Sequence, residues 1–266
     1  GRYFKEHAPH VKIIGADPLG SVHYHLFHTK TLPTAHVYMV EGIGEDIECR
    51  AMDFSVVDDM RQVNDRDSFV NARRLVKEEG LFCGGSSGSN VTVALEIAKE
   101  LGPGKVVVTV LPDHGNRYIS KFLSDKWMKE HGFNETAREL GFVEELLRTL
   151  KSKPITADAD APLRVVVNLM RDHGVSQIPL IERGKLNAIV HESDILTRLK
   201  SSELNLDAPA KAIASPIAGL IYPKARIEEL FHIFETDHVA VVVDASNVVG
   251  VISKIDLIEH LAGKKH

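Results

Sequence analysis

Residues 81–95 read LFCGGSSGSNVTVAL, and this stretch decides the fold class. An apolar LFC segment predicts a short strand, six small residues follow at 84–89, and an apolar helical pattern begins after Asn90. Small residues at a strand-to-helix turn let a ligand approach the backbone, and the free N–H groups of the next helix favour negative charge or lone pairs. A tight turn with a serine N-cap explains the same residues without a ligand. The turn alone leaves both interpretations open.

Strands and helices alternate around this turn. Apolar runs at 11–18 and 105–112 predict buried strands, and the second (KVVVTVLP) is continuous, as in a sheet covered on both faces. Apolar residues at helical spacing predict helices at 68–79, 91–101 and 116–131. Glycines that suit helix ends follow the first two of these helices, at Gly80 and Gly102. This alternation predicts a parallel α/β sheet with a ligand site at the carboxyl ends of its strands, where the small-residue turn and LPDHGNRY lie.

Composition excludes several classes of protein. The chain has 266 residues, more than one typical domain, with 44% apolar and 26% charged residues. The net charge of −5 without a long basic run argues against a nucleic-acid partner. The two cysteines, Cys49 and Cys83, form no disulfide framework and have no metal-ligand spacing, so we expect a reducing cytoplasm and no metal. No apolar run is long enough for a membrane span, and the first residues are no signal peptide.

The second half of the chain contains a repeat. Segment 164–199 aligns without gaps to segment 226–261, an offset of 62 residues, and each reads helix, strand, turn, strand, helix. Neither copy hides its sheet alone, so we expect the two to pack together. We therefore expect one domain at 154–205 and a second at 206–266. Residues 134–153 are predicted to form an amphipathic connecting helix after a first domain at 1–133.

The repeat resembles the paired CBS-domain, or Bateman, module. Members of that family carry an apolar-apolar-Ser/Thr-x-x-Asp segment in which the hydroxyl and carboxylate bind an adenosine ligand, and VISKIDL supplies Ser253 and Asp256. An Asp at a helix start is favoured by the helix dipole and accepts hydrogen bonds from a ribose diol. The alternative is that Asp256 only caps its helix. In the first copy His191 replaces the hydroxyl residue, although Asp194 remains, so we expect one adenosyl site to be better formed. The resemblance implies that this site combines Ser253, Ile255 and Asp256 with Val175 and Gln177, and that Asp194 marks the weaker one.

Residues 1–133 resemble the second half of the catalytic domain of the cystathionine β-synthases, pyridoxal-phosphate enzymes of fold-type II. Four stretches in the family's order carry the resemblance: IIGADPLGS (13–21), VEGIGED (40–46), GLFCGGSSGSN (80–90) and LPDHGNRYISKFLSDKWM (111–128). The resemblance covers nearly the whole chain. It implies part of a three-layer parallel-sheet catalytic domain followed by the tandem CBS module.

The resemblance also implies a role for the opening stretch. Ser86 matches the serine that hydrogen-bonds the pyridine nitrogen of pyridoxal phosphate. A hydroxyl leaves that nitrogen largely neutral, which suits elimination of a β-substituent. Gly84 and Gly85 let the backbone lie near the ring, and Gly42 and Gly44 match the loop beside cofactor and substrate, although a simple turn also explains these two.

The family's Schiff-base lysine lies in a Ser-x-Lys-Asp-Arg-like context, and no such segment occurs here. We therefore expect this lysine upstream of a partial chain that is inactive alone; the alternative is a regulatory polypeptide without catalysis. The implied reaction joins serine to homocysteine, with S-adenosylmethionine as effector and a homodimer or larger homo-oligomer as assembly. Two alternatives remain open: an O-acetylserine-dependent cysteine synthase, and a non-catalytic module that senses AMP or ATP.

Overall fold

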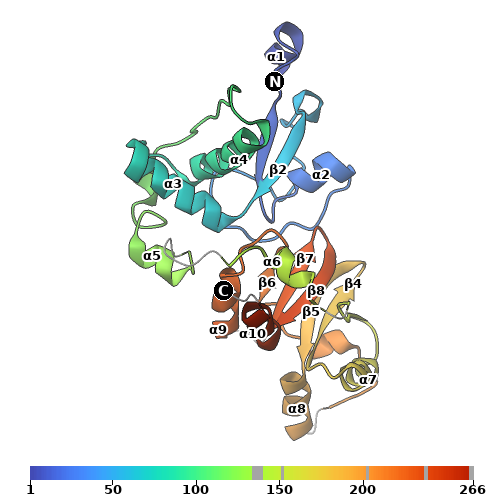
Figure 1. The fold of residues 1–266 in the computed structure, drawn as a ribbon. Coiled ribbons are helices and arrows are strands. Elements are labelled where there is room, and N and C mark those ends of the chain that lie inside the picture. Colours follow the sequence, from blue (N-terminus) through green and yellow to red (C-terminus); the bar gives the residue numbers. More distant parts are fainter. Residues whose placement is uncertain (134–139, 151–152, 202–203, 237–238, 264–266) are drawn as a thin grey trace. The chain divides into compact units, whose positions relative to one another are not determined.

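The computed structural model describes residues 1–133, 140–150, 153–201, 204–236 and 239–263 (Figure 1). The chain forms two compact units. Unit 1 comprises Gly1–Glu139 together with Lys224–Glu229, and unit 2 comprises Leu140–Pro223 with Leu230–His266. A short segment of the second repeat therefore belongs to unit 1, which the repeat pattern did not predict.

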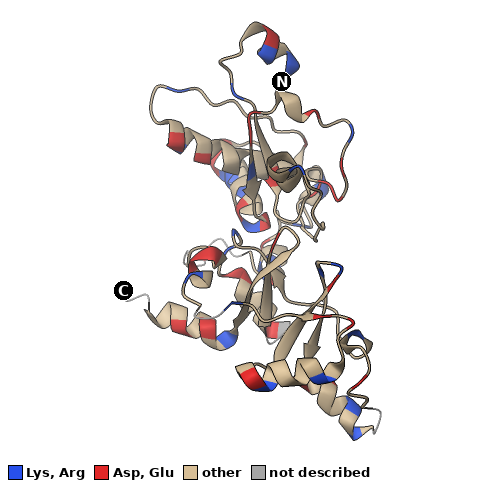
Figure 2. Cartoon of the chain, turned by 90° about the vertical axis from the view of Figure 1, so that its right-hand side faces the viewer, with Lys and Arg blue, Asp and Glu red and all other residues tan. Residues whose placement is uncertain are grey.

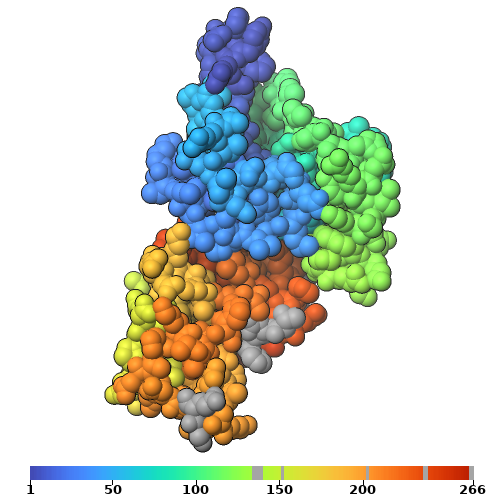
Figure 3. All heavy atoms as spheres, turned by 180° about the vertical axis from the view of Figure 1, so that it is seen from behind, coloured from blue at the N-terminus to red at the C-terminus, as the bar shows by residue number. Residues whose placement is uncertain are grey.

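Unit 1 is built on a two-stranded parallel sheet. Strands β1 (Ile14–Pro18) and β2 (Asp59–Val63) pair with Ile14 opposite Asp59, which confirms the strand predicted at 11–18. The helices are α1 (Arg2–His7), α2 (His23–Thr29), α3 (Asp65–Glu79), α4 (Gly85–Leu101) and α5 (Asp125–Glu130). Helix α1 buries no residue and projects from the unit at the dark blue end of Figure 3.

Helices α3 and α4 pack closely against each other, and α4 contains most of the stretch 81–95. Helix α3 ends at Gly80 in the left-handed conformation with φ 70°, and α4 ends before Gly102 with φ 74°, as predicted. The start of α4 corrects the prediction of a turn at 84–89. The helix begins at Gly85, with Gly84 as N-cap and no side-chain cap, so the small residues form its first turns. A Cβ at Gly88 would lie 1.9 Å from the backbone oxygen of Ser68, so only glycine permits this helix contact.

The apolar run at 105–112 is not a strand, which corrects the sequence prediction. Its valines Val106 and Val108 are 88% and 85% exposed. A strand needs a hydrogen-bonding neighbour, and the sheet of unit 1 consists of β1 and β2 alone among the described residues. The LFC segment likewise forms only an isolated bridge between Cys83 and His114.

Two predicted helices are shorter in the structure. The pattern at 116–131 divides into a 3₁₀ turn, Gly115–Tyr118, and α5, whose first turn Ser124 caps by accepting from the Trp127 N–H. The connecting helix expected over 134–153 is reduced among the described residues to α6 (Val143–Leu147); residues 134–139 and 151–152 lie outside them. A left-handed glycine, Gly141 with φ 102°, precedes α6, so the helix cannot extend back through it.

Unit 2 confirms the repeat. The first copy contains α7 (Leu163–His173), β4 (Gln177–Glu182), β5 (Lys185–His191) and α8 (Glu192–Lys200). The second contains α9 (Glu229–Thr236), β7 (Val239–Asp244), β8 (Asn247–Ser253) and α10 (Lys254–Gly263). In each copy a short third strand pairs in parallel with the first strand of the antiparallel pair. These are β3 (Ala157–Asp158), beside β4, and β6 (Leu220–Ile221), beside β7. Ile189 of β5 shares a buried cluster with Val239 and Val241 of β7, so the copies pack together as expected.

Candidate functional site

Ser86 lies at the start of α4, where helix geometry leaves backbone N–H groups without intrahelical partners. Its side chain is buried, with the residue 2% exposed, and its hydroxyl donates a long hydrogen bond of 3.4 Å to Asp113 Oδ1. A hydroxyl can donate to a ring nitrogen and carries no charge of its own. The contact of Ser86 with a pyridine ring, which the resemblance assigned to it, stays a prediction.

Asp113 is a residue of this site to which the sequence assigned no role. Its Oδ2 accepts a 2.6 Å hydrogen bond from the Tyr118 hydroxyl, and its backbone oxygen accepts one of 3.3 Å from the Gly84 N–H. Burial, followed by the hydrogen bond to Asp113, raises the pKa of Tyr118 to about 12, so the phenol remains a donor at neutral pH. A Cβ at Gly84 would lie 2.1 Å from Asp113 Oδ1. The sequence offered one signal for Asp113: it directly follows the apolar run at 105–112, which was predicted to end at the same sheet edge as the small-residue turn.

The EGIGED loop carries two left-handed glycines, Gly42 with φ 79° and Gly44 with φ 80°. A Cβ at Gly42 would meet no atom within 4 Å, which leaves open space beside that backbone, whereas one at Gly44 would lie 2.6 Å from Pro18. Gly85 lines a cavity of about 250 Å³ together with Met39 and Glu41, next to this loop. The fold thus brings the small-residue helix start and the approach to the EGIGED loop to one cavity, although Ser86 does not line it.

Unit 2 contains a larger cavity, of about 860 Å³. Four of the six predicted adenosyl residues line it: Val175, Gln177, Ser253 and Asp256. They come from the start of β4 in the first copy and the β8–α10 junction in the second. Ile255, which is 58% exposed, and Asp194 are not among the lining residues.

The two matched aspartates differ in their contacts. Asp256 Oδ2 accepts the Ser253 N–H at 2.7 Å and the Ser253 hydroxyl, so Asp256 caps α10. Asp194 Oδ2 accepts the His191 N–H at 2.9 Å in the same way. In addition, the Ser215 hydroxyl lies 3.4 Å from both Asp194 oxygens, so Asp194 has a further hydrogen-bond donor from outside its own helix. Both aspartates are helix caps, and Asp256 is the one that also faces a cavity.

The cavity of unit 2 is lined by two acidic residues, Asp256 and Glu259, and two basic ones, Lys153 and His260, among the described residues. Asp256 and Glu259 contribute carboxylates, and Lys153 is the one Lys or Arg among the described lining residues. Lys211 lies elsewhere, with Nζ 2.7 Å from Asp160 and 2.9 Å from Glu182. Lys224 belongs to unit 1, where its Nζ lies 5.4 Å from the Tyr24 ring centroid. The sequence did not identify Lys153 or Glu259, because neither belongs to the matched motif.

Other features exclude further kinds of site within the described part of the chain. No cluster of three or more His, Cys, Asp or Glu side chains there has the geometry to hold a metal ion. Figure 2 shows acidic and basic residues interspersed along the helices rather than gathered into a basic face. Among the described helices, none combines the length and apolarity that crossing a membrane requires.

Comparisons with known proteins match both halves. The family model for pyridoxal-phosphate dependent enzymes matches residues 1–113, and the CBS domain model matches 143–201 and 212–263. The cystathionine beta-synthase of Mus musculus is 34% identical over 99% of this chain and 53% of its own length. That of Dictyostelium discoideum is 31% identical over 98% of this chain and 55% of its own. The cysteine synthase of Dictyostelium discoideum is 33% identical over 49% of this chain and 37% of its own.

Among solved structures, a CBS domain protein from Pyrobaculum aerophilum complexed with AMP is similar to part of the chain. The TM-score is 0.40 at 25% identity, and the match covers 46% of this chain and 99% of that one. The chain spans about half the length of the cystathionine beta-synthases that it matches. It joins part of a pyridoxal-phosphate dependent enzyme domain to a tandem CBS pair, and over nearly its whole length it is similar to the cystathionine beta-synthases.

Proposed function

We propose that the complete protein is a cystathionine β-synthase that replaces the β-hydroxyl of serine by the thiol of homocysteine. The observation that carries this proposal is similarity to cystathionine beta-synthases over 99% of the chain, through both the enzyme part and the CBS pair. The cysteine synthase matches only 49% of the chain, so a cysteine synthase activity has less support.

Pyridoxal phosphate, when bound, supplies the electron sink that lets a β-substituent leave. In this chain the Ser86 hydroxyl would donate to the ring nitrogen of the bound cofactor, in place of the long hydrogen bond that it donates to Asp113 in this structure. Gly84 and Gly85 keep the helix start free of side chains, and Gly42 leaves space beside the EGIGED loop. Because a hydroxyl does not hold the nitrogen protonated, the site favours elimination over transamination.

The test compares two substrate pairs in the complete protein loaded with cofactor. Serine plus homocysteine is expected to give the larger kcat/KM, and a larger value for O-acetylserine plus sulfide would identify a cysteine synthase. Ser86→Asp is expected to shift the absorbance of the bound cofactor and to slow β-replacement strongly. Ser193→Asp is the matched control, because Ser193 is likewise the second residue of a helix, α8, but lies in the CBS pair. An unchanged spectrum in Ser86→Asp would refute the role of Ser86.

We also propose that the 860 Å³ cavity of unit 2 binds an adenosyl ligand, with S-adenosylmethionine as the first choice. Ser253 and Asp256 supply the hydroxyl and carboxylate that suit a ribose. Asp256 and Glu259 favour a ligand that carries positive charge, as a sulfonium does. A nucleotide phosphate requires several cationic donors, and Lys153 is the one Lys or Arg among the described lining residues.

Calorimetry on the 266-residue chain tests this site with two matched variants. Asp256→Ala and Asp194→Ala each remove a helix cap, at about 1 kcal/mol, but only Asp256 faces the cavity. S-adenosylmethionine binding is therefore expected to disappear in Asp256→Ala and to persist in Asp194→Ala. Binding of AMP or ATP without S-adenosylmethionine would instead support an energy sensor. Binding of none of these would make Asp256 a cap only.

A further inference from the structure

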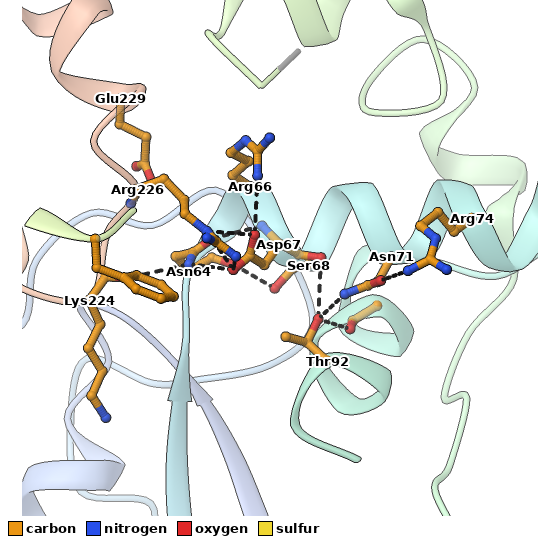
Figure 4. A network of polar contacts seen from close by, with 12 residues as sticks. Asn64, Arg66, Asp67, Ser68, Asn71, Arg74, Thr92, Lys224, Arg226 and Glu229 are labelled. Atoms are coloured by element: carbon orange, nitrogen blue, oxygen red, sulfur yellow. Dashed lines mark hydrogen bonds and ion pairs between the residues drawn. The ribbon is translucent and has the colours of Figure 1, made fainter. Parts of the chain in front are cut away.

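The segment 224–229 of the second repeat is fixed to the start of α3 in unit 1. Arg226 Nε lies 3.1 Å from both carboxylate oxygens of Asp67, and Arg226 Nη2 lies 3.0 Å from Oδ2. The two side chains are only 15% and 14% exposed. Figure 4 shows Arg226 reaching from its loop to Asp67 on the first turn of α3. A partly buried guanidinium with two donors on one carboxylate fixes orientation as well as distance.

Further contacts hold both sides of this ion pair. The Asn64 side chain caps α3 by accepting the Asp67 N–H at 2.7 Å, and it donates to the Lys224 backbone oxygen at 3.3 Å. On the loop side, Glu229 Oε1 accepts the Arg226 N–H at 2.9 Å. The loop and the helix start therefore form one hydrogen-bonded assembly.

The first turn of α3 is in turn connected to the first turns of α4. The Thr92 hydroxyl donates to the Asp67 backbone oxygen at 3.3 Å, and the Ser89 hydroxyl donates to the Ser68 hydroxyl at 2.9 Å. Gly88 allows no gap here, since a Cβ on it would lie 1.9 Å from the Ser68 oxygen. A displacement of the α3 start therefore moves the turn of α4 that carries Ser86.

The first repeat provides an internal comparison. Arg164 stands 62 residues before Arg226, at the equivalent position of the first copy. It pairs with Asp207, and the two side chains are 53% and 73% exposed. An exposed ion pair contributes about 0–1 kcal/mol to stability. The arginine of the first copy therefore forms only a weak surface ion pair.

We infer that Arg226, a residue of the second CBS repeat, is a positioning residue for the cofactor-binding helix start of the enzyme domain. It acts through Asp67 and the α3–α4 contact on the orientation of the Ser86 hydroxyl. This inference rests on the proposed function insofar as Ser86 holds the cofactor. It adds that the CBS repeat contributes a residue that sets the geometry of the catalytic domain.

The test uses Arg226→Gln and the matched control Arg164→Gln in the complete protein. Amide hydrogen exchange in peptides covering 84–92 is expected to accelerate about tenfold in Arg226→Gln and to stay unchanged in Arg164→Gln. The absorbance band of bound pyridoxal phosphate is expected to shift in the first variant only. Arg226→Lys, which keeps the charge but not the two-donor geometry, is expected to fall between wild type and Arg226→Gln.

Asp67→Asn gives a second route to the same contact. It is expected to accelerate exchange at 84–92 as Arg226→Gln does, and the double variant is expected to add nothing further. Unchanged exchange at 84–92 in both single variants would overturn the inference, as would an equal effect of Arg164→Gln. If Arg226→Gln fails to fold, Arg226→Lys and Asp67→Asn decide by the same exchange measurement. If wild type shows no cofactor band, the proposed function fails, while the exchange result still decides whether Arg226 positions α4.

Discussion

Gly88→Ala tests how closely α3 and α4 approach. The new methyl carbon would lie 1.9 Å from the Ser68 backbone oxygen and 2.8 Å from the Ala72 nitrogen. A carbon and a carbonyl oxygen normally meet at about 3.3 Å, so the helices must separate locally by about 1.4 Å. Overpacking of this kind destabilises by about 1–3 kcal/mol. Stretching the Ser89–Ser68 hydrogen bond adds about 1 kcal/mol, and the better helix propensity of alanine recovers a similar amount.

The expected result is a free energy of unfolding about 1–3 kcal/mol lower, measured by urea titration. Trp127, the single tryptophan of the chain, reports on unit 1 because its ring lies 5.4 Å from that of Phe69 on α3. Gly80→Ala is the control: its Cβ would meet nothing within 4 Å, and only the φ of 70° opposes it, at about 1 kcal/mol. Equal effects of the two substitutions would refute the close contact.

Titration, hydrogen bonding and packing each supply another test. Removal from water, above all, raises the pKa of Glu229 from 4.5 to about 8. The unfolded chain loses this proton at a lower pH than the folded chain does, so the free energy of unfolding falls as pH rises from about 4.5 to about 8. Glu229→Gln is expected to flatten this fall in urea titrations at several pH values. Tyr118→Phe removes the donor to Asp113 and is expected to lower the free energy of unfolding by about 1.5–3 kcal/mol by tryptophan fluorescence, whereas no loss would contradict that bond. Gly250→Ala places a Cβ 2.3 Å from the movable end of Leu147, so a drop of about 1 kcal/mol is expected in thermal unfolding, and a much larger one would show that Leu147 cannot yield.

Local patterns predicted the elements that local contacts determine. The repeat was readable because each copy carries its own apolar strand pair and helices, and Gly80 and Gly102 marked helix ends through their left-handed φ. The segment at 105–112 failed because strand pairing depends on a neighbour that no local pattern encodes. The connecting helix was predicted too long because Gly141 adopts a left-handed φ of 102° just before α6 (Val143–Leu147).

Some residues of the candidate sites could likewise be predicted from local sequence motifs, and others could not. The Ser-x-x-Asp motif located Ser253 and Asp256, and the resemblance placed Val175 and Gln177 at the same cavity. Lys153 also lines that cavity, but it belongs to no recognised motif and so could not be predicted. The ion pair of Asp67 and Arg226 joins residues 159 positions apart, so only the folded chain brings them together. Asp113 was visible as a residue, but its bonds to Ser86 and Tyr118 were not.

The exposed valines of the 105–112 segment affect how this chain behaves in concentrated solution. Val106, Val108 and Val110 are 88%, 85% and 68% exposed, in a stretch without secondary structure that is rich in β-branched residues and pairs with no strand among the described residues. Such a stretch is a template for intermolecular β-pairing. Pro103 on one side and Pro112 on the other lack a backbone N–H and confine that pairing to about eight residues, the role of gatekeepers against fibre growth. The 266-residue chain is therefore expected to form small β-paired assemblies with rising concentration rather than long fibrils.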